Sequence, residues 1–213
     1  MPQFLPYISL LILAALISLY RWPILSRADR WVCLLLCATL LQESLAEYFK
    51  VQFKNNFITY HIYTPIELFI IALYFDQSMR FKHPYRVGIS IGILGIILSI
   101  INTVYFQPIH TFNSYYLLFE GCIVVSLCLL SFYKLLIRED IITRRMSNFW
   151  LTMCFLFYWS LTYVNLGLFT VQIGRDDMLA KVFTWTLYLA NLLFYFGLAL
   201  VFLRYKKLIP SGE

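Results

Sequence analysis

Four glutamates and one histidine stand inside long apolar segments, where charged side chains are costly and are candidates for function. Glu43 and Glu47 are four residues apart, so a helix places both on one face. His61 and Glu67 share the next apolar segment, and Glu120 lies in a later one. Carboxylates and imidazole rings bind cations, hold metal ions or transfer protons. These five residues are therefore the first candidates for chemistry.

Three uncharged residues in the last two apolar segments join them as candidates. Polar side chains on separate helices at similar depth are satisfied at least cost when they converge on one water-accessible cavity. For the uncharged residues alone, the alternative is separate hydrogen bonds between helices, each worth about 0.6–2 kcal/mol. We expect a polar pocket for a small ligand, lined by Glu43, Glu47, His61, Glu67, Glu120, Asn165, Tyr188 and Asn191.

The composition places all these residues in a membrane protein. Of the 213 residues, 61% are hydrophobic and 13% are charged, whereas soluble domains have about 45–50% apolar and about 25% charged residues. A helical span needs about 20 apolar residues. We predict one all-α domain over residues 1–213, a seven-transmembrane-helix bundle with no soluble domain, whose spans cover residues 4–20, 31–49, 56–79, 84–106, 112–137, 146–173 and 178–204.

The basic residues predict the orientation of this bundle. Of the 17 Lys and Arg residues, all but Lys50, Lys54, Arg175 and Lys181 fall on one side of the predicted membrane. The positive-inside rule makes that side cytoplasmic, with the N-terminus outside and the C-terminus in the cytoplasm. The candidate residues then occupy the outer half, while the inner half is almost entirely Leu, Ile, Val, Phe and Cys. The pocket is expected to open outward, in a multi-pass protein of the inner (plasma) membrane.

Charge and glycine patterns indicate the partners. The net charge of +6 comes from short loops beside apolar runs, which topology explains better than nucleic-acid binding. The same basic loops offer a surface to anionic lipid headgroups or to a cytoplasmic or membrane signalling partner. Gly88, Gly92 and Gly95 allow close approach of another helix, either from the same chain or from a second copy in a homo-oligomer.

We weigh a retinal pigment and three other function classes. A retinal pigment needs a lysine buried in the seventh span. Lys181 lies at the outer edge of that span and Asn191 at its middle, so retinal is not expected and the cofactor stays unknown. A metal-dependent hydrolase would rely on the glutamates with His61 as the one histidine suitably placed, and no metal is assigned. A small-solute or proton-coupled transporter or channel would use Glu67, but it needs a polar route through the inner half. The leading hypothesis is a receptor or sensor without enzymatic activity.

A resemblance supports the sensor hypothesis. Glu43, the Asn55-Asn56 pair, the segment from Tyr63 to Glu67 and the run Phe112-Asn113-Ser114 resemble features of uncharacterised small bacterial inner-membrane proteins with seven transmembrane helices. These are similar in turn to the stand-alone form of seven-helix sensor regions of histidine kinases. The resemblance extends over the whole chain and implies a sensor-like protein in a bacterial inner membrane, without implying any catalytic residue or ligand.

Overall fold

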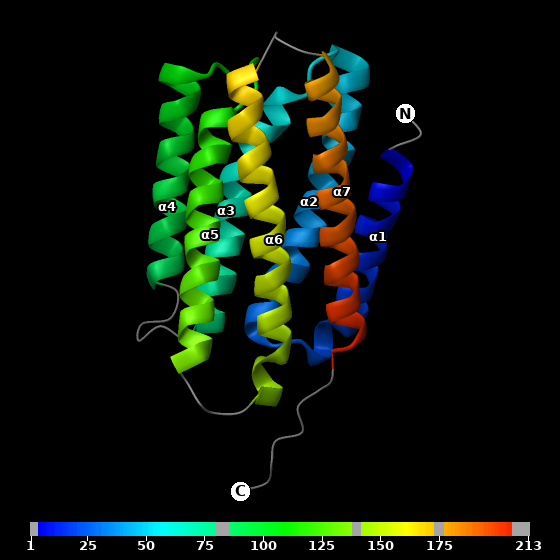
Figure 1. Ribbon diagram of the computed structural model, residues 1–213, viewed down its shortest axis with the longest axis vertical. Helices are drawn as coiled ribbons and strands as arrows, with labels where there is room; N and C mark the ends of the chain where they lie inside the picture. Colours follow the sequence, from blue (N-terminus) through cyan, green and yellow to red (C-terminus); the bar gives the residue numbers. More distant parts are fainter. Residues whose placement is uncertain (1–3, 80–85, 138–141, 173–176, 206–213) are drawn as a thin grey trace, which may run out of the picture.

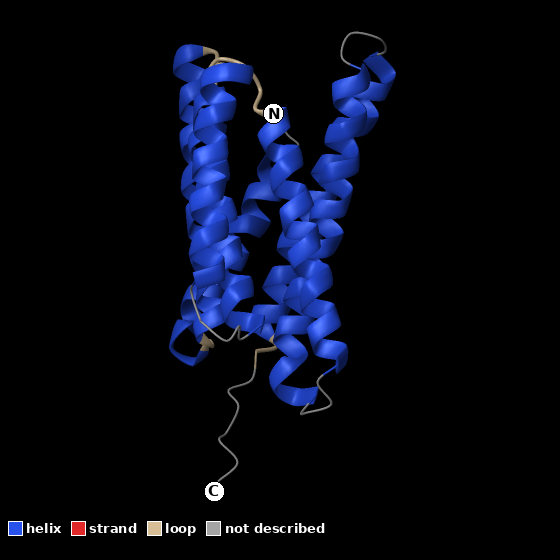
Figure 2. Ribbon diagram, turned by 90° about the vertical axis from the view of Figure 1, so that its left-hand side faces the viewer, coloured by secondary structure: helices blue, strands red, loops and turns tan. Residues whose placement is uncertain are grey.

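A computed structural model describes residues 4–79, 86–137, 142–172 and 177–205 of the chain. Within them, seven helices are long and apolar enough to cross a membrane, which confirms the all-α, seven-helix prediction and indicates a multi-pass membrane protein. Figure 2 draws every element as helix. The long helices are α1 Phe4–Arg21, α2 Arg27–Phe53, α3 Phe57–Met79, α4 Arg86–Ile101, α5 Ser114–Ile137, α6 Ile142–Gln172 and α7 Asp177–Leu203.

Local capping explains why α2 extends beyond both ends of its predicted span. The Ser26 hydroxyl accepts a hydrogen bond from the Asp29 backbone N–H at 3.1 Å, which starts the helix four residues earlier than expected. The helix ends where Lys54 adopts a left-handed conformation with φ 56°. Between α1 and α2 lies the short 3-10 helix η1, Trp22–Ile24.

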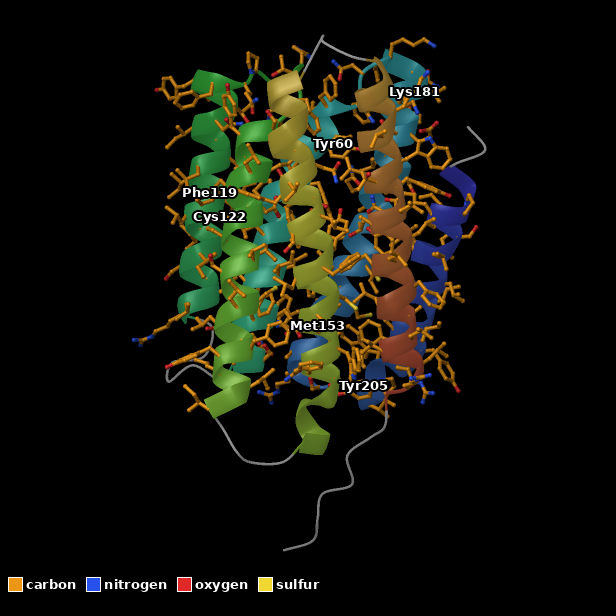
Figure 3. The ribbon with its side chains drawn as sticks, in the orientation of Figure 1. Tyr60, Phe119, Cys122, Met153, Lys181 and Tyr205 are labelled. Carbon is orange, nitrogen blue, oxygen red and sulfur yellow. The ribbon has the colours of Figure 1, made fainter. Side chains whose placement is uncertain are left out.

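Six of the long helices form a closed ring, and α4 lies outside it. Each member packs on two neighbours in the order α1, α2, α3, α5, α6, α7 and back to α1, whereas α4 packs mainly on α3. We call the end with the 54–56 and 107–113 loops the upper end, and the end with η1 and Tyr205 the lower end, as in Figure 1. Figure 3 shows Lys181 at the upper end and Tyr205 at the lower end.

The outer surface of the bundle is apolar. On α4, Ile93, Ile97 and Ile100 are 50%, 48% and 58% exposed, while Gly92 and Ser99 are buried. A soluble helix would show the reverse arrangement. This arrangement suits a helix whose free face meets lipid.

The glycines of α4 pack within the chain. A Cβ added at Gly88 would lie 3.0 Å from the Ala72 carbonyl oxygen of α3, and one added at Gly92 would overlap the Phe69 ring. Gly95 likewise faces Leu68. The close approach that these glycines permit is therefore to α3 of the same chain, which is one of the two alternatives that the sequence left open. Homo-oligomerisation itself stays a prediction.

The part of the bundle nearer the lower end is more polar than predicted. Buried polar side chains there come from α1, α2, α3, α5 and α6, in a part that the sequence predicted to be almost entirely apolar. Two of them lie within hydrogen-bonding distance, with 3.5 Å between the hydroxyl oxygens of Ser131 and Thr152. The residues are Ser18, Asp29, Asp76, Ser131 and Thr152.

A polar clamp joins α7 to the start of α2 at the lower end. The Tyr205 hydroxyl accepts a hydrogen bond from the Ser26 backbone N–H at 2.9 Å and donates one to Asp29 Oδ2 at 2.9 Å. The Ser26 hydroxyl donates to the same oxygen at 2.7 Å. Burial raises the pKa of Tyr205 to about 12, so its hydroxyl stays protonated and able to donate. The segment that follows α7 is thus tied to the start of α2.

Candidate functional site

Three helices of the ring direct one glutamate each toward its centre. Glu43 comes from α2, Glu67 from α3 and Glu120 from α5. Glu67 lies within electrostatic range of both other carboxyl groups. Glu120 is 0% exposed, while Glu43 and Glu67 keep some accessible surface. The structure therefore brings together three of the residues that the sequence singled out.

Tyrosines from the other three ring helices complete the group. The Tyr158 side chain on α6 lies within electrostatic range of all three glutamates. The Tyr7 hydroxyl on α1 lies within hydrogen-bonding reach of Glu43, and its ring centroid is 5.6 Å from that of Tyr195 on α7. Each ring helix thus contributes one residue to what we call the central cluster: Tyr7, Glu43, Glu67, Glu120, Tyr158 and Tyr195.

Glu120 is the least satisfied member of the cluster. Both of its carboxyl oxygens are buried and have no hydrogen-bond partner among the described residues. The same holds for the Tyr116 hydroxyl and the Trp159 indole nitrogen nearby on α5 and α6. Buried polar atoms are nearly always hydrogen-bonded, and exceptions often mark functional positions. The group therefore has unused hydrogen-bonding capacity.

The carboxyl groups of the cluster also lack a basic counterpart. Among the described side chains, the buried polar set contains no Lys or Arg. Glu47, one turn above Glu43 on α2, pairs with Lys50 at 3.4 Å, but that ion pair lies at the exposed upper end. Buried carboxylates are costly without a paired cation or several donors. The cluster therefore favours the binding of a proton or of a positively charged group.

An aromatic floor separates the cluster from the lower end. Tyr158 stacks on Phe194 with ring centroids 4.5 Å apart, and Phe194 packs on Phe155 at 5.5 Å. Phe155 in turn contacts Tyr74 and Phe75 at 5.6 and 5.9 Å. Phe155, Tyr74 and Phe75 are all 0% exposed. Below Tyr158, packed aromatic side chains of α3, α6 and α7 thus occupy this side of the ring interior.

His61 lies apart from the central cluster, in a network at the upper end. Its Nε2 donates to the Thr111 carbonyl oxygen at 3.0 Å, since a carbonyl oxygen only accepts, and its Nδ1 lies 2.9 Å from the Thr103 hydroxyl. Thr103 belongs to η2, the π-helix Asn102–Phe106 that continues α4. π-Helical turns are often found at functional sites. Here the turn lets His61 tie α3 to the 107–113 loop.

The other predicted site residues make local contacts. The side-chain amides of Asn165 and Asn191 donate to carbonyl oxygens one turn earlier in their own helices, those of Leu161 and Leu187, each at 2.9 Å. Tyr188 packs its ring on Trp185 with centroids 5.7 Å apart. Within the described residues, no hydrogen bond or ring contact joins these three to the glutamates, and their role in ligand binding stays a prediction.

Tyr7, Tyr158 and Tyr195 are the members that sequence reasoning did not select as site residues. Each is a tyrosine inside an apolar span, where its hydroxyl needs a buried partner. Carboxylates on neighbouring spans are the natural partners. The need of a tyrosine hydroxyl in an apolar span for a hydrogen-bond partner is the sequence feature that could have identified these three residues.

The donor set does not form a metal centre. Within residues 4–79, 86–137, 142–172 and 177–205, no three His, Cys, Asp or Glu side chains lie together as metal ligands. The carboxyl groups are spread over three helices instead. The geometry therefore lends no support to the hydrolase hypothesis, and the position of Lys181 at the exposed upper end lends none to retinal binding.

No family model, curated protein or solved structure matches the chain. The resemblance to small bacterial sensor-like membrane proteins therefore stays a prediction.

Proposed function

We propose that the protein is a membrane receptor or sensor that binds a small ligand at the central cluster and signals through a separate partner. The observation that carries the proposal is the convergence of one polar side chain from each of the six ring helices. Glu120 adds two carboxyl oxygens without a partner among the described residues. A ligand that engaged these groups would contact the whole ring at once.

Such contacts supply a signalling route. A ligand shifts a conformational equilibrium by binding one arrangement of helices better than another. Small helix shifts are the usual way in which helical membrane and subunit interfaces respond. At the lower end, the Tyr205 clamp links α7 to α2, so a relative movement of these two ring helices would reach that surface.

We infer the orientation from the basic residues. The helix ends nearest η1 and Tyr205 carry Arg21, Arg27, Arg30, Lys134 and Arg204. The lower end is then cytoplasmic, with the N-terminus outside. The aromatic floor supports access from the upper, outer end. The basic lower end is the surface for the signalling partner, and the plasma membrane is the location that this orientation implies.

A screen of small molecules against the purified protein in lipid nanodiscs tests the proposal. We expect a ligand that raises the unfolding temperature of the wild type, with at least tenfold weaker affinity for Glu67→Gln. Tyr105→Phe, at an exposed tyrosine of η2 outside the ring, is the control and should bind as the wild type does. Ligands that bind equally to all three proteins would place recognition elsewhere and refute a role for the cluster.

A small-solute or proton-coupled transporter is the second candidate. The buried hydroxyls of Ser131 and Thr152 and the carboxyl group of Asp76, nearer the lower end, favour it. A transporter would move solute or protons in proteoliposomes, with flux lowered in Glu67→Gln. A receptor would bind its ligand without net flux, so the same preparation distinguishes the two.

A further inference from the structure

The charge and hydrogen-bonding needs of the central cluster indicate which class of ligand it binds. Three carboxyl groups converge from α2, α3 and α5, and the buried polar side chains that the structure describes include no Lys or Arg. A ligand that brought further negative charge would add to their repulsion. A ligand with positive charge would relieve it.

The unsatisfied atoms indicate how that charge is carried. The two oxygens of Glu120 are hydrogen-bond acceptors without a donor among the described residues, in a side chain that is 0% exposed. Carboxylates form their strongest hydrogen bonds with charged N–H donors. N–H groups of a ligand would therefore satisfy these acceptors. A primary amine in its ammonium form has such N–H groups, whereas a quaternary ammonium has none.

Aromatic side chains complete the match. Tyr7, Tyr158 and Tyr195 bring rings to the same place, with Tyr7 and Tyr195 centroids 5.6 Å apart. Trp159, whose ring centroid is 5.8 Å from that of Tyr158, is 2% exposed and has an indole N–H without a partner in the described part of the chain. Ring faces attract cations and pack well on hydrocarbon. The surroundings thus suit an amine attached to an apolar body.

A bare metal ion fits the cluster less well. Its ligands must lie within about 2–2.6 Å of one point, and in the described residues no three carboxylate, imidazole or thiol side chains are grouped in that way. Carboxyl groups spread over three helices are better spanned by a molecule of several atoms.

We propose that the central cluster binds a small primary amine, whose ammonium group donates hydrogen bonds to Glu120 and Glu67 while its hydrocarbon part packs on the tyrosine rings. This inference rests on the proposed ligand-binding role of the cluster and adds the chemical class of the ligand.

Matched probes test the class without any variant. Benzylamine and 1,4-diaminobutane carry the proposed ammonium group, benzyl alcohol replaces it with a hydroxyl, and benzyltrimethylammonium keeps the charge without an N–H. Isothermal titration of the wild type in nanodiscs, against empty nanodiscs, should show saturable binding of at least one amine. Benzyl alcohol and benzyltrimethylammonium should bind at least tenfold more weakly than benzylamine if benzylamine is the amine bound.

Variants then locate the contact. Glu120→Gln keeps the size of the side chain and should weaken amine binding about tenfold or more, and Tyr158→Phe should weaken it less. Tyr105→Phe, at an exposed tyrosine of η2 outside the ring, should leave it unchanged. Equal affinity of the amine for Glu120→Gln and the wild type would overturn the proposed contact, as would failure of both amines to bind.

The outcomes separate this inference from the function on which it rests. A neutral or anionic compound that binds the wild type and loses affinity in Glu67→Gln would refute the amine class and keep the cluster as a receptor site. A ligand of any class that binds every cluster variant as tightly as the wild type would refute both proposals.

Discussion

Glu120 has a buried carboxyl group whose two oxygens lack hydrogen-bond partners among the described residues. Such a group is costly to the fold, so its presence is better explained by a ligand than by stability. The neighbouring Glu67 makes the arrangement more costly through like-charge repulsion when both are ionised. Helix packing thus buries the Glu120 side chain, although burial without a partner is unfavourable for its carboxyl group.

This conflict predicts that Glu120→Gln leaves the ligand-free protein as stable as the wild type or more stable. The amide has the same shape and removes the repulsion from Glu67, so we expect a rise in unfolding temperature of zero to about 4 °C. Thermal unfolding in detergent, followed by tryptophan fluorescence, measures it, with Glu47→Gln as the control. A fall of several degrees would mean that Glu120 makes hydrogen bonds that hold the fold together.

Tyr205 is the opposite case, a polar residue whose hydrogen bonds are satisfied. Tyr205→Phe removes the acceptor of the Ser26 N–H and a donor to Asp29, and we expect it to lower the free energy of unfolding by about 1–3 kcal/mol. Tyr105→Phe, at a tyrosine that is 78% exposed, is the control. Reversible unfolding in mixed micelles gives both values, and equal stability of the two variants would contradict a structural clamp.

The same variant predicts a pH dependence. Burial raises the pKa of Tyr205 from 10.0 to about 12. A raised pKa means that its stabilisation is complete below pH 10 and is lost as pH rises toward 12. The stability difference between wild type and Tyr205→Phe should therefore be constant from pH 7 to 9 and shrink above pH 10. A difference that grew above pH 10 would have the wrong sign.

At the scale of elements, glycines decide where α4 lies. Ile93, Ile97 and Ile100 face outward while Gly88, Gly92 and Gly95 let the backbone of α4 approach α3. Helix pairs in membranes gain most from such close packing, because lipid tails are as apolar as the side chains they replace. The position of α4 outside the ring leaves the ring interior to the other six helices.

Gly92→Ala tests this packing. The added methyl group would overlap the Phe69 ring, and we expect overpacking to cost about 1–3 kcal/mol of stability. Adding Phe69→Leu should recover part of that loss, because it makes room for the methyl group. Ile93→Ala, on the outward face, is the control for α4 alone. Additive effects of the changes at positions 69 and 92 would contradict direct contact.

At the scale of the whole molecule, the ring encloses polar groups inside an apolar exterior. The basic residues at the lower end predict that this end faces the cytoplasm. A green fluorescent protein fused after residue 213 should therefore fluoresce in bacterial cells, and alkaline phosphatase at the same place should be inactive. Fusions in the 54–56 turn should behave in the opposite way. The reverse result at both places would invert the orientation.

Much of this architecture could be read from the sequence. Apolar runs of about 20 residues must form helices in a membrane because lipid offers no hydrogen bonds to the backbone. Glutamates in such runs must turn away from lipid. These two physical requirements predicted seven helices and singled out Glu43, Glu67 and Glu120 without any knowledge of helix order in space.

Only the tertiary structure decided which helices meet. Local sequence does not say that α4 lies outside the ring, because Ser99 and Asn102 look as inward-facing as Glu120 until their neighbours are known. Nor does it separate His61, which bonds η2 and the 107–113 loop, from Glu67 six residues later. The three tyrosines of the central cluster joined the glutamates through contacts between helices far apart in the chain, and such pairings depend on the packing of whole helix faces.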